Sequence, residues 1–245
     1  LTYYILGRWN ELSKFSGKEY IVKTIVTTEL LIDIANKYNV KSFDVLTGFK
    51  FIADTILNNP EMTFVCGGEE SYGFLIGDFV RDKDANSACF MIAEIAAWAA
   101  EQNKSLYQIL KEIYKEFGFY KEGLISLTKK GISGTEEIKN MMRKFREEPP
   151  TEILGSRIVE IKDYKIGISK DIISGKETEI KLPKSDVLQF FTEDGTKISV
   201  RPSGTEPKIK FYFGIKAELN DIADFDTVND KLNNRLNELG KLFSE

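Results

Sequence analysis

The sequence contains no histidine among its 245 residues and has two cysteines. Without histidine the chain cannot form a Ser-His-Asp triad, a Cys-His pair or a histidine-ligated metal site. Any proton transfer must then use carboxylates, lysines, tyrosines or a phosphate group of a substrate. Cys66 and Cys89 lack CxxC spacing and lie in apolar stretches. We therefore expect two reduced, buried thiols in a cytoplasmic protein, with neither a disulfide nor a zinc site.

Long apolar runs and a strong excess of either charge are also absent. The longest wholly apolar runs, such as IAAWAA at residues 95–100, fall far short of the ~20 residues that cross a bilayer. With 34 basic and 38 acidic residues the net charge is −4, so no general electrostatic field attracts nucleic acid or an anionic membrane. We expect neither as a partner, and any bound anion must be held by a local cluster.

The first residues, LTYYIL, include no Met and no basic region of a signal peptide. They resemble the middle of a helix, and we expect the chain to be a piece of a longer protein. Its hydrophobic content of 42% is enough to form packed cores, so the chain is expected to be globular.

Residues 1–118 alternate strand-like and helix-like segments, which is typical of an α/β fold: a layered α/β/α domain with a mainly parallel sheet. The strand candidates are residues 20–26, 43–46 and 62–66, and the helix candidates are residues 29–38, 49–57, 85–102 and 105–117. The spacing in the third helix predicts one buried stripe, formed by Ala88, Ile92, Ile95, Ala96 and Ala99. The fourth helix opens with Ser105-x-x-Gln108, the pattern of a capping box.

Residues 119–245 have a different pattern, which predicts a small α+β domain preceded by a connecting segment. A helix over residues 135–147 stops at Pro149 and Pro150, and several strand-like runs follow it. A last helix over residues 227–243 repeats apolar residues every three or four positions, which indicates one buried face: Val228, Leu232, Leu236, Leu239 and Phe243. The polar run 157–185 gives no clear strand limits. We place the domain boundary near residues 118–121.

The stretch ISVRPSGTEPKIKFYF, residues 198–213, joins two strand-like runs through a turn rich in anion-binding groups. Alternation of apolar and polar residues predicts that both strands are half-buried. Arg201 offers a planar fork that binds a phosphate bidentately. Ser203 and Thr205 add hydroxyl donors, and Gly204 lets backbone N–H groups approach an anion.

The alternative for this stretch is an ordinary turn in which Arg201 pairs with Glu206. Lys208 and Lys210 follow the turn and add positive charge. The cluster therefore favours an anion site over a simple turn.

Two further loops follow predicted strands in the first domain, GGEESYG at residues 67–73 and LTGFKF at residues 46–51. Ligands bind at the carboxyl ends of strands in open α/β sheets, so both loops are candidates for one site. Glu69 and Ser71 suit hydrogen bonds to neighbouring sugar hydroxyls, because a carboxylate accepts two such bonds and a serine both donates and accepts. Thr47 and Gly48 reach the same edge. The alternative for GGEESYG is a solvated acidic loop. The alternative for Lys50 is a surface position on a helix.

At this point the chain resembles the α-D-phosphohexomutase family, the phosphoglucomutases and phosphomannomutases. The matching motifs are LTGFKFIADTI, GGEESYGFLIGDFVRDKDAN, SLYQILKEIYKEFGFY and VRPSGTEPKIKFYF, in the family's order. The sequences of these motifs are most similar to those of bacterial phosphoglucomutases. Family proteins have four domains around a cleft, and the resemblance implies that residues 1–118 form the third, sugar-binding domain and residues 119–245 the fourth, phosphate-binding domain.

The resemblance also implies roles for single residues. The sugar would be bound by Glu69, Ser71, Thr47, Gly48, Lys83 and, less securely, Lys23. The phosphate would be bound by Arg201, Ser203, Gly204 and Thr205. Alternatives exist for the two lysines: Lys23 on an exposed strand face, and Lys83 paired with Asp82 or Asp84 at a helix start.

The family's reaction implies groups that this sequence lacks. A phosphoserine of the first domain exchanges phosphate with the sugar through a bisphosphate intermediate, with Mg²⁺ held by an aspartate-rich loop of the second domain. Neither the serine loop nor a D-x-D-x-D motif occurs here. The complete enzyme is expected to use Mg²⁺ and glucose 1,6-bisphosphate, and to need the N-terminal domains of the same chain, which are missing here.

We therefore expect a phosphosugar substrate but no mutase activity from these residues alone. One alternative is a non-catalytic phosphosugar-binding module, and another is a phosphopentomutase. An RNA-binding domain fits poorly, because the basic residues form no extended stripe with exposed aromatic residues.

Overall fold

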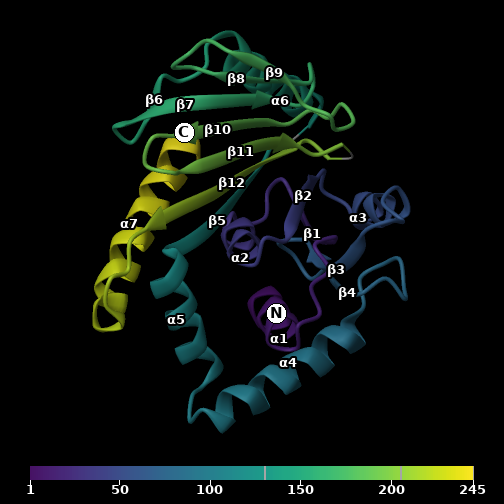
Figure 1. Ribbon diagram of the computed structural model, residues 1–245. Helices are drawn as coiled ribbons and strands as arrows, with labels where there is room; N and C mark the ends of the chain where they lie inside the picture. Colours follow the sequence, from purple (N-terminus) through teal and green to yellow (C-terminus); the bar gives the residue numbers. More distant parts are fainter. Residues whose placement is uncertain (130, 205, 245) are drawn as a thin grey trace. The chain divides into compact units, whose positions relative to one another are not determined.

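The computed structural model describes residues 1–129, 131–204 and 206–244 and forms two compact units (Figure 1). The first unit comprises Leu1–Phe119 together with Glu218–Phe225. The second comprises Tyr120–Ala217 together with the residues from Asp226 onward. Each unit has its own sheet.

The first unit alternates helices and strands along the chain. Its elements are α1 (Thr2–Glu11), β1 (Glu19–Thr24), α2 (Leu30–Lys37), β2 (Lys41–Val45), α3 (Phe49–Leu57), β3 (Thr63–Gly68), β4 (Phe74–Ile76), α4 (Ala85–Glu101), α5 (Leu106–Phe117) and the 3₁₀ turn η1 (Ile222–Asp224). The sheet order is β2-β1-β3-β4, in which β4 alone is antiparallel to its neighbour. The mainly parallel sheet predicted from the sequence is confirmed.

Alternate residues of β1 face the two sides of this sheet. Tyr20 and Val22 are fully buried in an apolar cluster with Ile52 and Ile56 of α3 and Leu75 of β4. Helices α1 and α2 contact the sheet as well, α1 through β3 and α2 through β1 and β2. Both faces of β1 are therefore covered, which explains why all six of its residues are buried.

The helix signals of the first unit are largely confirmed. Helix α3 has the predicted limits. Helix α5 begins with the predicted capping box, in which Ser105 Oγ accepts from the Gln108 N–H at 3.2 Å and Gln108 Oε1 accepts from the Ser105 N–H at 2.7 Å. Two backbone donors that the helix leaves unpaired are satisfied in this way.

Two expectations about α4 were wrong. In the predicted stripe Ile95 and Ala99 are buried, but Ile92 is 46% exposed and Ala96 is exposed as well. Two other residues of α4 contact α1, where the Tyr4 ring packs on Trp98 at 5.1 Å and the Tyr4 hydroxyl donates to Glu94 at 2.8 Å. Cys89, also on this helix, is exposed, whereas Cys66 is buried as expected.

A late segment of the chain completes the first unit. The Phe225 ring stacks on the Phe119 ring at 4.7 Å and meets the Tyr107 ring edge-on at 5.6 Å. The Lys111 ammonium lies 4.4 Å from the centre of the same ring. Phe225 is 5% exposed, so residues 218–225 are an integral part of this unit although they follow most of the second unit in the sequence.

The second unit is built on an antiparallel sheet. Its elements are β5 (Phe119–Thr128), α6 (Gly131–Glu147), β6 (Glu152–Ile153), β7 (Ser156–Asp163), β8 (Ile168–Asp171), β9 (Glu177–Glu179), β10 (Leu188–Thr192), β11 (Lys197–Pro202), β12 (Lys208–Ala217) and α7 (Phe225–Ser244). The sheet order is β5-β12-β11-β10-β7-β8-β9, with β6 paired to β7. This α+β arrangement confirms the second part of the predicted fold class.

Helices α6 and α7 share one hydrophobic core with this sheet. Phe145 of α6 lies 6.0 Å from Phe190 of β10 and 6.0 Å from Phe243 of α7, measured between ring centres. Phe243 in turn lies 5.2 Å from Phe211 of β12. The predicted apolar face of α7 is confirmed at Leu232, Leu239 and Phe243, which are buried, while Val228 and Leu236 are half-buried.

The strands that carry the ISVRPSGT motif are more deeply buried than expected. Ser199 is fully buried and Lys197 is 6% exposed, although alternation predicted that both would face solvent. Gln189 of β10 explains the burial of Ser199, because its Nε2 donates to Ser199 Oγ at 2.8 Å and its Oε1 accepts from the Tyr164 hydroxyl at 2.7 Å. Side chains on the second face thus satisfy one another without water.

Candidate functional site

The carboxyl ends of β1, β2 and β3 meet at one edge of the first sheet, because these three strands are parallel (Figure 1). Near this edge Lys23 of β1 is paired in register with Asp44 of β2 and Gly68 of β3. The loops around Thr47 and Glu69, which the sequence analysis selected, therefore start from neighbouring positions.

Glu69 joins these two loops directly. Its Oε1 accepts from the Gly48 N–H at 2.8 Å, and its own N–H donates to the Gly73 carbonyl at 2.8 Å. Gly48 is the N-cap of α3 with a φ of 120°, so the Glu69 carboxylate lies where the helix dipole favours a negative charge. The structure thus brings together two of the predicted sugar-binding residues and orients the carboxylate of one of them.

The glycine pair before Glu69 is required by close packing. A Cβ on Gly67 would lie 2.5 Å from the Val22 carbonyl oxygen, and a Cβ on Gly68 would lie 2.5 Å from that of Gly73. Only glycine fits such close backbone approaches. The loop is therefore fixed on the sheet at its first two residues.

Two other residues predicted to bind the sugar, Ser71 and Thr47, belong to the same two loops. Ser71 is exposed and Thr47 is half-buried. Their side chains are accessible to a ligand, and their roles stay predictions.

Lys83 lies next to the start of α3. Its ammonium is 5.6 Å from the centre of the Phe49 ring and 3.1 Å from Asp82 Oδ1. Hydrogen bonds from the Lys83 side chain and backbone hold the pKa of Asp82 below its ordinary value. Asp84 instead caps α4 by accepting from the backbone N–H groups of the first turn. The pairing with Asp82 that the sequence left open thus occurs, and the lysine remains half exposed.

Lys23 departs from the exposed position that the sequence left open as an alternative. It does not lie on an exposed strand face, because its side chain is fully buried. Its ammonium lies 2.9 Å from Asp44 Oδ1 and 3.0 Å from Glu29 Oε1, and it contacts the Thr24 and Thr27 carbonyls at 3.5 Å. Two carboxylates thus neutralise its charge, and its role in sugar binding stays a prediction.

The second candidate site is the turn between β11 and β12. Pro202 pairs with Ile209 across the two strands, and the Ser203 N–H donates to the Lys208 carbonyl at 2.7 Å. A Cβ added to Gly204 would meet no atom within 4 Å, so the backbone there is open to solvent. Thr205, the fourth predicted phosphate-binding residue, lies outside the described residues.

Positive charge is concentrated on one face of this turn. Arg201 of β11 and Lys210 of β12 are directly opposite each other, and both are half-buried. Within residues 1–129, 131–204 and 206–244 neither forms an ion pair with a carboxylate, so the alternative pairing of Arg201 with Glu206 is not present. Like charges opposite each other in a sheet destabilise it, and a bound anion would relieve that repulsion.

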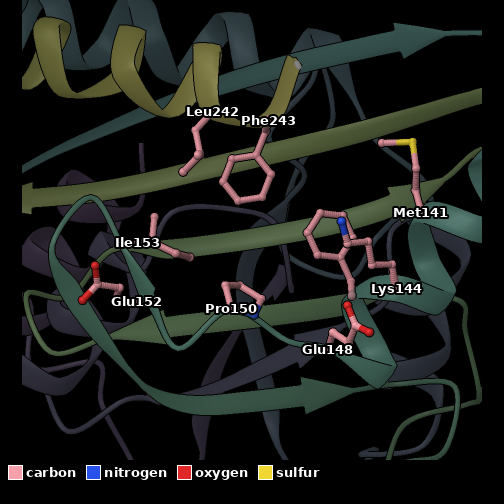
Figure 2. Close-up of a pocket in the computed structure, with 9 residues that line it drawn as sticks. Met141, Lys144, Glu148, Pro150, Glu152, Ile153, Leu242 and Phe243 are labelled. Carbon is pink, nitrogen blue, oxygen red and sulfur yellow. The ribbon is translucent and has the colours of Figure 1, made fainter.

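An apolar cavity of about 410 Å³ lies elsewhere in the second unit, between α6, β6 and α7 (Figure 2). Its wall includes Phe145, Ile153 and Phe243, with Lys144 and two glutamates at its margin. One ammonium among hydrocarbon and carboxylates is a poor match for a phosphate. The cavity is therefore a poorer candidate for an anion site than the turn after β11.

In the part of the chain that the structure describes, no group of three or more Cys, Asp and Glu side chains could hold a metal ion. No helix in these residues is both long and apolar enough to cross a membrane.

Two family models match parts of this chain. A family model described as phosphoglucomutase/phosphomannomutase, alpha/beta/alpha domain III, matches residues 2–117, and one described as phosphoglucomutase/phosphomannomutase, C-terminal domain, matches residues 157–226. The chain belongs to the phosphoglucomutase/phosphomannomutase family. The resemblance predicted from its motifs, to the third and fourth domains, is thereby confirmed.

Similar curated members of the phosphoglucomutase/phosphomannomutase family include bacterial phosphoglucomutases. The chain is 37% identical over 215 residues to the phosphoglucomutase of Staphylococcus epidermidis, which covers 87% of this chain and 38% of that protein. It is 38% identical over 214 residues to that of Staphylococcus aureus, with 87% and 38% coverage. The chain thus spans under two fifths of the length of these relatives.

Solved structures of phosphohexomutases share the fold. The open form of parafusin, a phosphoglucomutase from Paramecium, aligns with a TM-score of 0.60 at 16% identity, covering 97% of this chain and 41% of that chain. A phosphomannomutase structure from Thermus thermophilus aligns with a TM-score of 0.57 at 14% identity, covering 100% and 40%. At such identities the likeness supports the fold alone.

Sequence reasoning missed several polar residues at the edge of the first sheet. Thr24 and Thr27 hydrogen-bond to each other at 2.9 Å, and Thr24 Oγ1 donates to Glu70 Oε2 at 3.2 Å. The two threonines are visible at and just after the end of β1 in the sequence, but a partner 46 residues away cannot be recognised from the local pattern.

Proposed function

We propose that this protein is the substrate-binding part of a phosphohexose mutase, an isomerase that interconverts hexose 1-phosphate and hexose 6-phosphate through a bisphosphate intermediate. The observation that carries the proposal is the facing pair of Arg201 and Lys210. Neither side chain forms an ion pair with a carboxylate of the described residues, and the pair lies next to the open turn at Ser203 and Gly204. The family to which the chain belongs supplies the reaction class.

The turn after β11 suits a phosphate dianion. The Arg201 guanidinium can donate two parallel hydrogen bonds to two phosphate oxygens. Ser203 and the exposed Gly204 backbone add donors beside it, and Lys210 contributes a second positive charge. A neutral sugar without phosphate would gain none of these charge-assisted bonds.

The loop after β3 suits sugar hydroxyl groups. Glu69 uses Oε1 to accept from Gly48, which leaves Oε2 as an acceptor for a ligand. Ser71 and Thr47 can each donate and accept, and the exposed Lys83 ammonium is a further donor. Neighbouring hydroxyls of a hexose match such a set of donors and acceptors.

Binding is tested by titration calorimetry with glucose 6-phosphate. The proposal expects Arg201→Ala to weaken binding more than Glu70→Ala does. Arg157→Ala is the matched control, because Arg157 is an exposed arginine on β7 of the same unit. Equal affinity in the wild-type protein and the first two variants would refute the assignment of the phosphate to this turn.

The chain alone is proposed to be inactive, since it offers groups that position a substrate and no phosphoryl donor. Positioning accelerates phosphoryl transfer only when the reacting phosphoryl is held as well. We propose that the complete enzyme also needs Mg²⁺, which would neutralise charge on the transferring phosphoryl, and glucose 1,6-bisphosphate. Incubation with glucose 1-phosphate, Mg²⁺ and a trace of glucose 1,6-bisphosphate should give no glucose 6-phosphate, and measurable conversion would contradict this.

A non-catalytic phosphosugar-binding module would give the same binding result. A serine loop and an aspartate-rich loop encoded upstream would favour the enzyme, and their absence would favour the module. A panel of glucose, mannose and ribose phosphates separates hexose from pentose mutases. We propose a cytoplasmic location, because such substrates are intracellular and the buried Cys66 is a free thiol.

A further inference from the structure

Two neighbouring glutamates of the loop after β3 are held by different parts of the sheet edge. Glu69 accepts from the Gly48 N–H, in the loop before α3, at 2.8 Å. Glu70 accepts from the hydroxyl of Thr24, the last residue of β1, at 3.2 Å. The loop after β3 is thus fastened both to the end of β1 and to the loop that follows β2.

The residue that anchors Glu70 is buried and hydrogen-bonded in turn. Thr24 is fully buried and hydrogen-bonds to Thr27 Oγ1 at 2.9 Å. Each hydroxyl has one proton, and a carboxylate at neutral pH has none. Thr24 therefore donates to Glu70, and Thr27 donates to Thr24. The bond to Glu70 is charge-assisted, which makes it stronger than one between neutral groups.

The tip of the loop shows why two anchors are needed. Tyr72 has a φ of 50°, in the left-handed region that costs energy for a residue other than glycine. Its side chain is fully exposed, so ring packing does not impose this conformation. What holds the loop is the Glu69 N–H bond to the Gly73 carbonyl, at 2.8 Å, and the two carboxylate anchors.

We propose that Glu70 is a positioning residue for sugar binding. It does not contact the sugar. It holds the loop through the Thr24 hydroxyl, so that Glu69 and Ser71 are already placed when a ligand arrives. A loop ordered in advance loses less conformational entropy on binding and therefore binds more tightly. This inference rests on the proposed function of the loop.

Hydrogen–deuterium exchange tests the anchor without any ligand. Glu70→Ala should increase exchange across residues 67–73 while leaving α5 unchanged. Glu70→Gln should restore protection, because its amide oxygen still accepts from Thr24. Thr24→Val should mimic Glu70→Ala. Unchanged exchange of residues 67–73 in Glu70→Ala would overturn the proposal, whatever the binding data show.

Calorimetry tests the consequence for the sugar. Glu70→Ala should weaken glucose 6-phosphate binding by about tenfold, the effect of one charge-assisted hydrogen bond, and leave inorganic phosphate binding unchanged. Glu70→Gln should bind within about twofold of the wild-type protein by the same reasoning. Glu61→Ala, which changes an exposed glutamate of the same unit, is the control.

The two proposals fail in different ways. If the wild-type protein binds no glucose 6-phosphate, the proposed function fails while the exchange result still decides the anchor. If sugar and inorganic phosphate weaken together in Glu70→Ala, or if Glu70→Gln is as weak as Glu70→Ala, Glu70 does not act by positioning the sugar loop.

Discussion

Lys23 and Asp44 face each other across the parallel strands β1 and β2, and the Lys23 ammonium lies 2.9 Å from Asp44 Oδ1. Glu29 Oε1 also lies near this ammonium, at 3.0 Å. The lysine is fully buried, whereas the Glu29 and Asp44 side chains are 33% and 40% exposed. One deeply buried charge is thus balanced by two carboxylates that keep part of their hydration.

Replacing Lys23 should destabilise the first unit. Lys23→Met keeps the apolar stem but leaves two partly buried carboxylates next to each other. We expect a loss of about 2 kcal/mol in the free energy of unfolding, below the usual cost of breaking a fully buried pair because both carboxylates reach water. Urea unfolding measures it, with Lys18→Met, an exposed lysine, as the control. A variant as stable as the wild type would show that this ion pair contributes nothing.

Glu19 should make stability depend on acid pH. Burial alone would raise its pKa, but hydrogen bonds from the Ser16 hydroxyl and N–H and from the Gly17 N–H hold it below the ordinary value of 4.5. The stabilisation is therefore present above about pH 4.5 and is lost as the pH falls through the lower, folded-state pKa.

Glu19→Gln measures this effect. The variant should be less stable at pH 7 by about 1 kcal/mol, because an amide oxygen replaces only part of the carboxylate's acceptor capacity. The difference from the wild type should shrink toward pH 3. Urea unfolding at both pH values, with Glu61→Gln as the control, checks this. A constant difference would mean that the carboxylate charge is not what stabilises the fold.

The two cysteines should differ sharply in reactivity. Burial raises the pKa of the Cys66 thiol to about 11, so at pH 8 it is neutral as well as inaccessible. Cys89 is exposed on α4. Iodoacetamide at pH 8 should therefore label Cys89 in the native protein and reach Cys66 only in urea, as peptide mass spectrometry would show. Equal labelling of both thiols without denaturant would contradict the burial of β3.

Arg201→Lys should separate charge from geometry at the turn after β11. The variant keeps the positive charge opposite Lys210 but loses the planar fork. Binding of inorganic phosphate should weaken by about tenfold, since one of two parallel hydrogen bonds is lost. Arg157→Lys should bind like the wild type. If Arg201→Lys also binds like the wild type, the phosphate is held by charge alone.

Local signals in the sequence predicted the regular elements well. The capping box at Ser105 and the apolar spacing of α3 depend only on residues close together in the sequence, so they could be recognised without the fold. The strand ends that carry Thr47 and Glu69 could be placed on one edge because parallel strands share a direction.

Features that depend on distant partners could not be predicted. Alternation suggested that Ser199 faces solvent, but Gln189 on the next strand pairs with it in the interior. The bond between Thr24 and Glu70 joins residues 46 positions apart, and neither residue type is distinctive by itself. In α4, Ile92 fits the helical stripe, yet no neighbouring element covers it and it is 46% exposed. Tertiary context decided each of these outcomes.

The Phe225 ring, stacked on Phe119 at 4.7 Å, also constrains how this protein is made. Because residues 218–225 complete the first unit, that unit cannot be finished when residue 119 leaves the ribosome. About another hundred residues must be translated, at ~5–20 residues per second, before Phe225 can pack on Phe119 and Tyr107. During synthesis the two units therefore mature in overlapping order, and the aromatic surface of the first is exposed for several seconds.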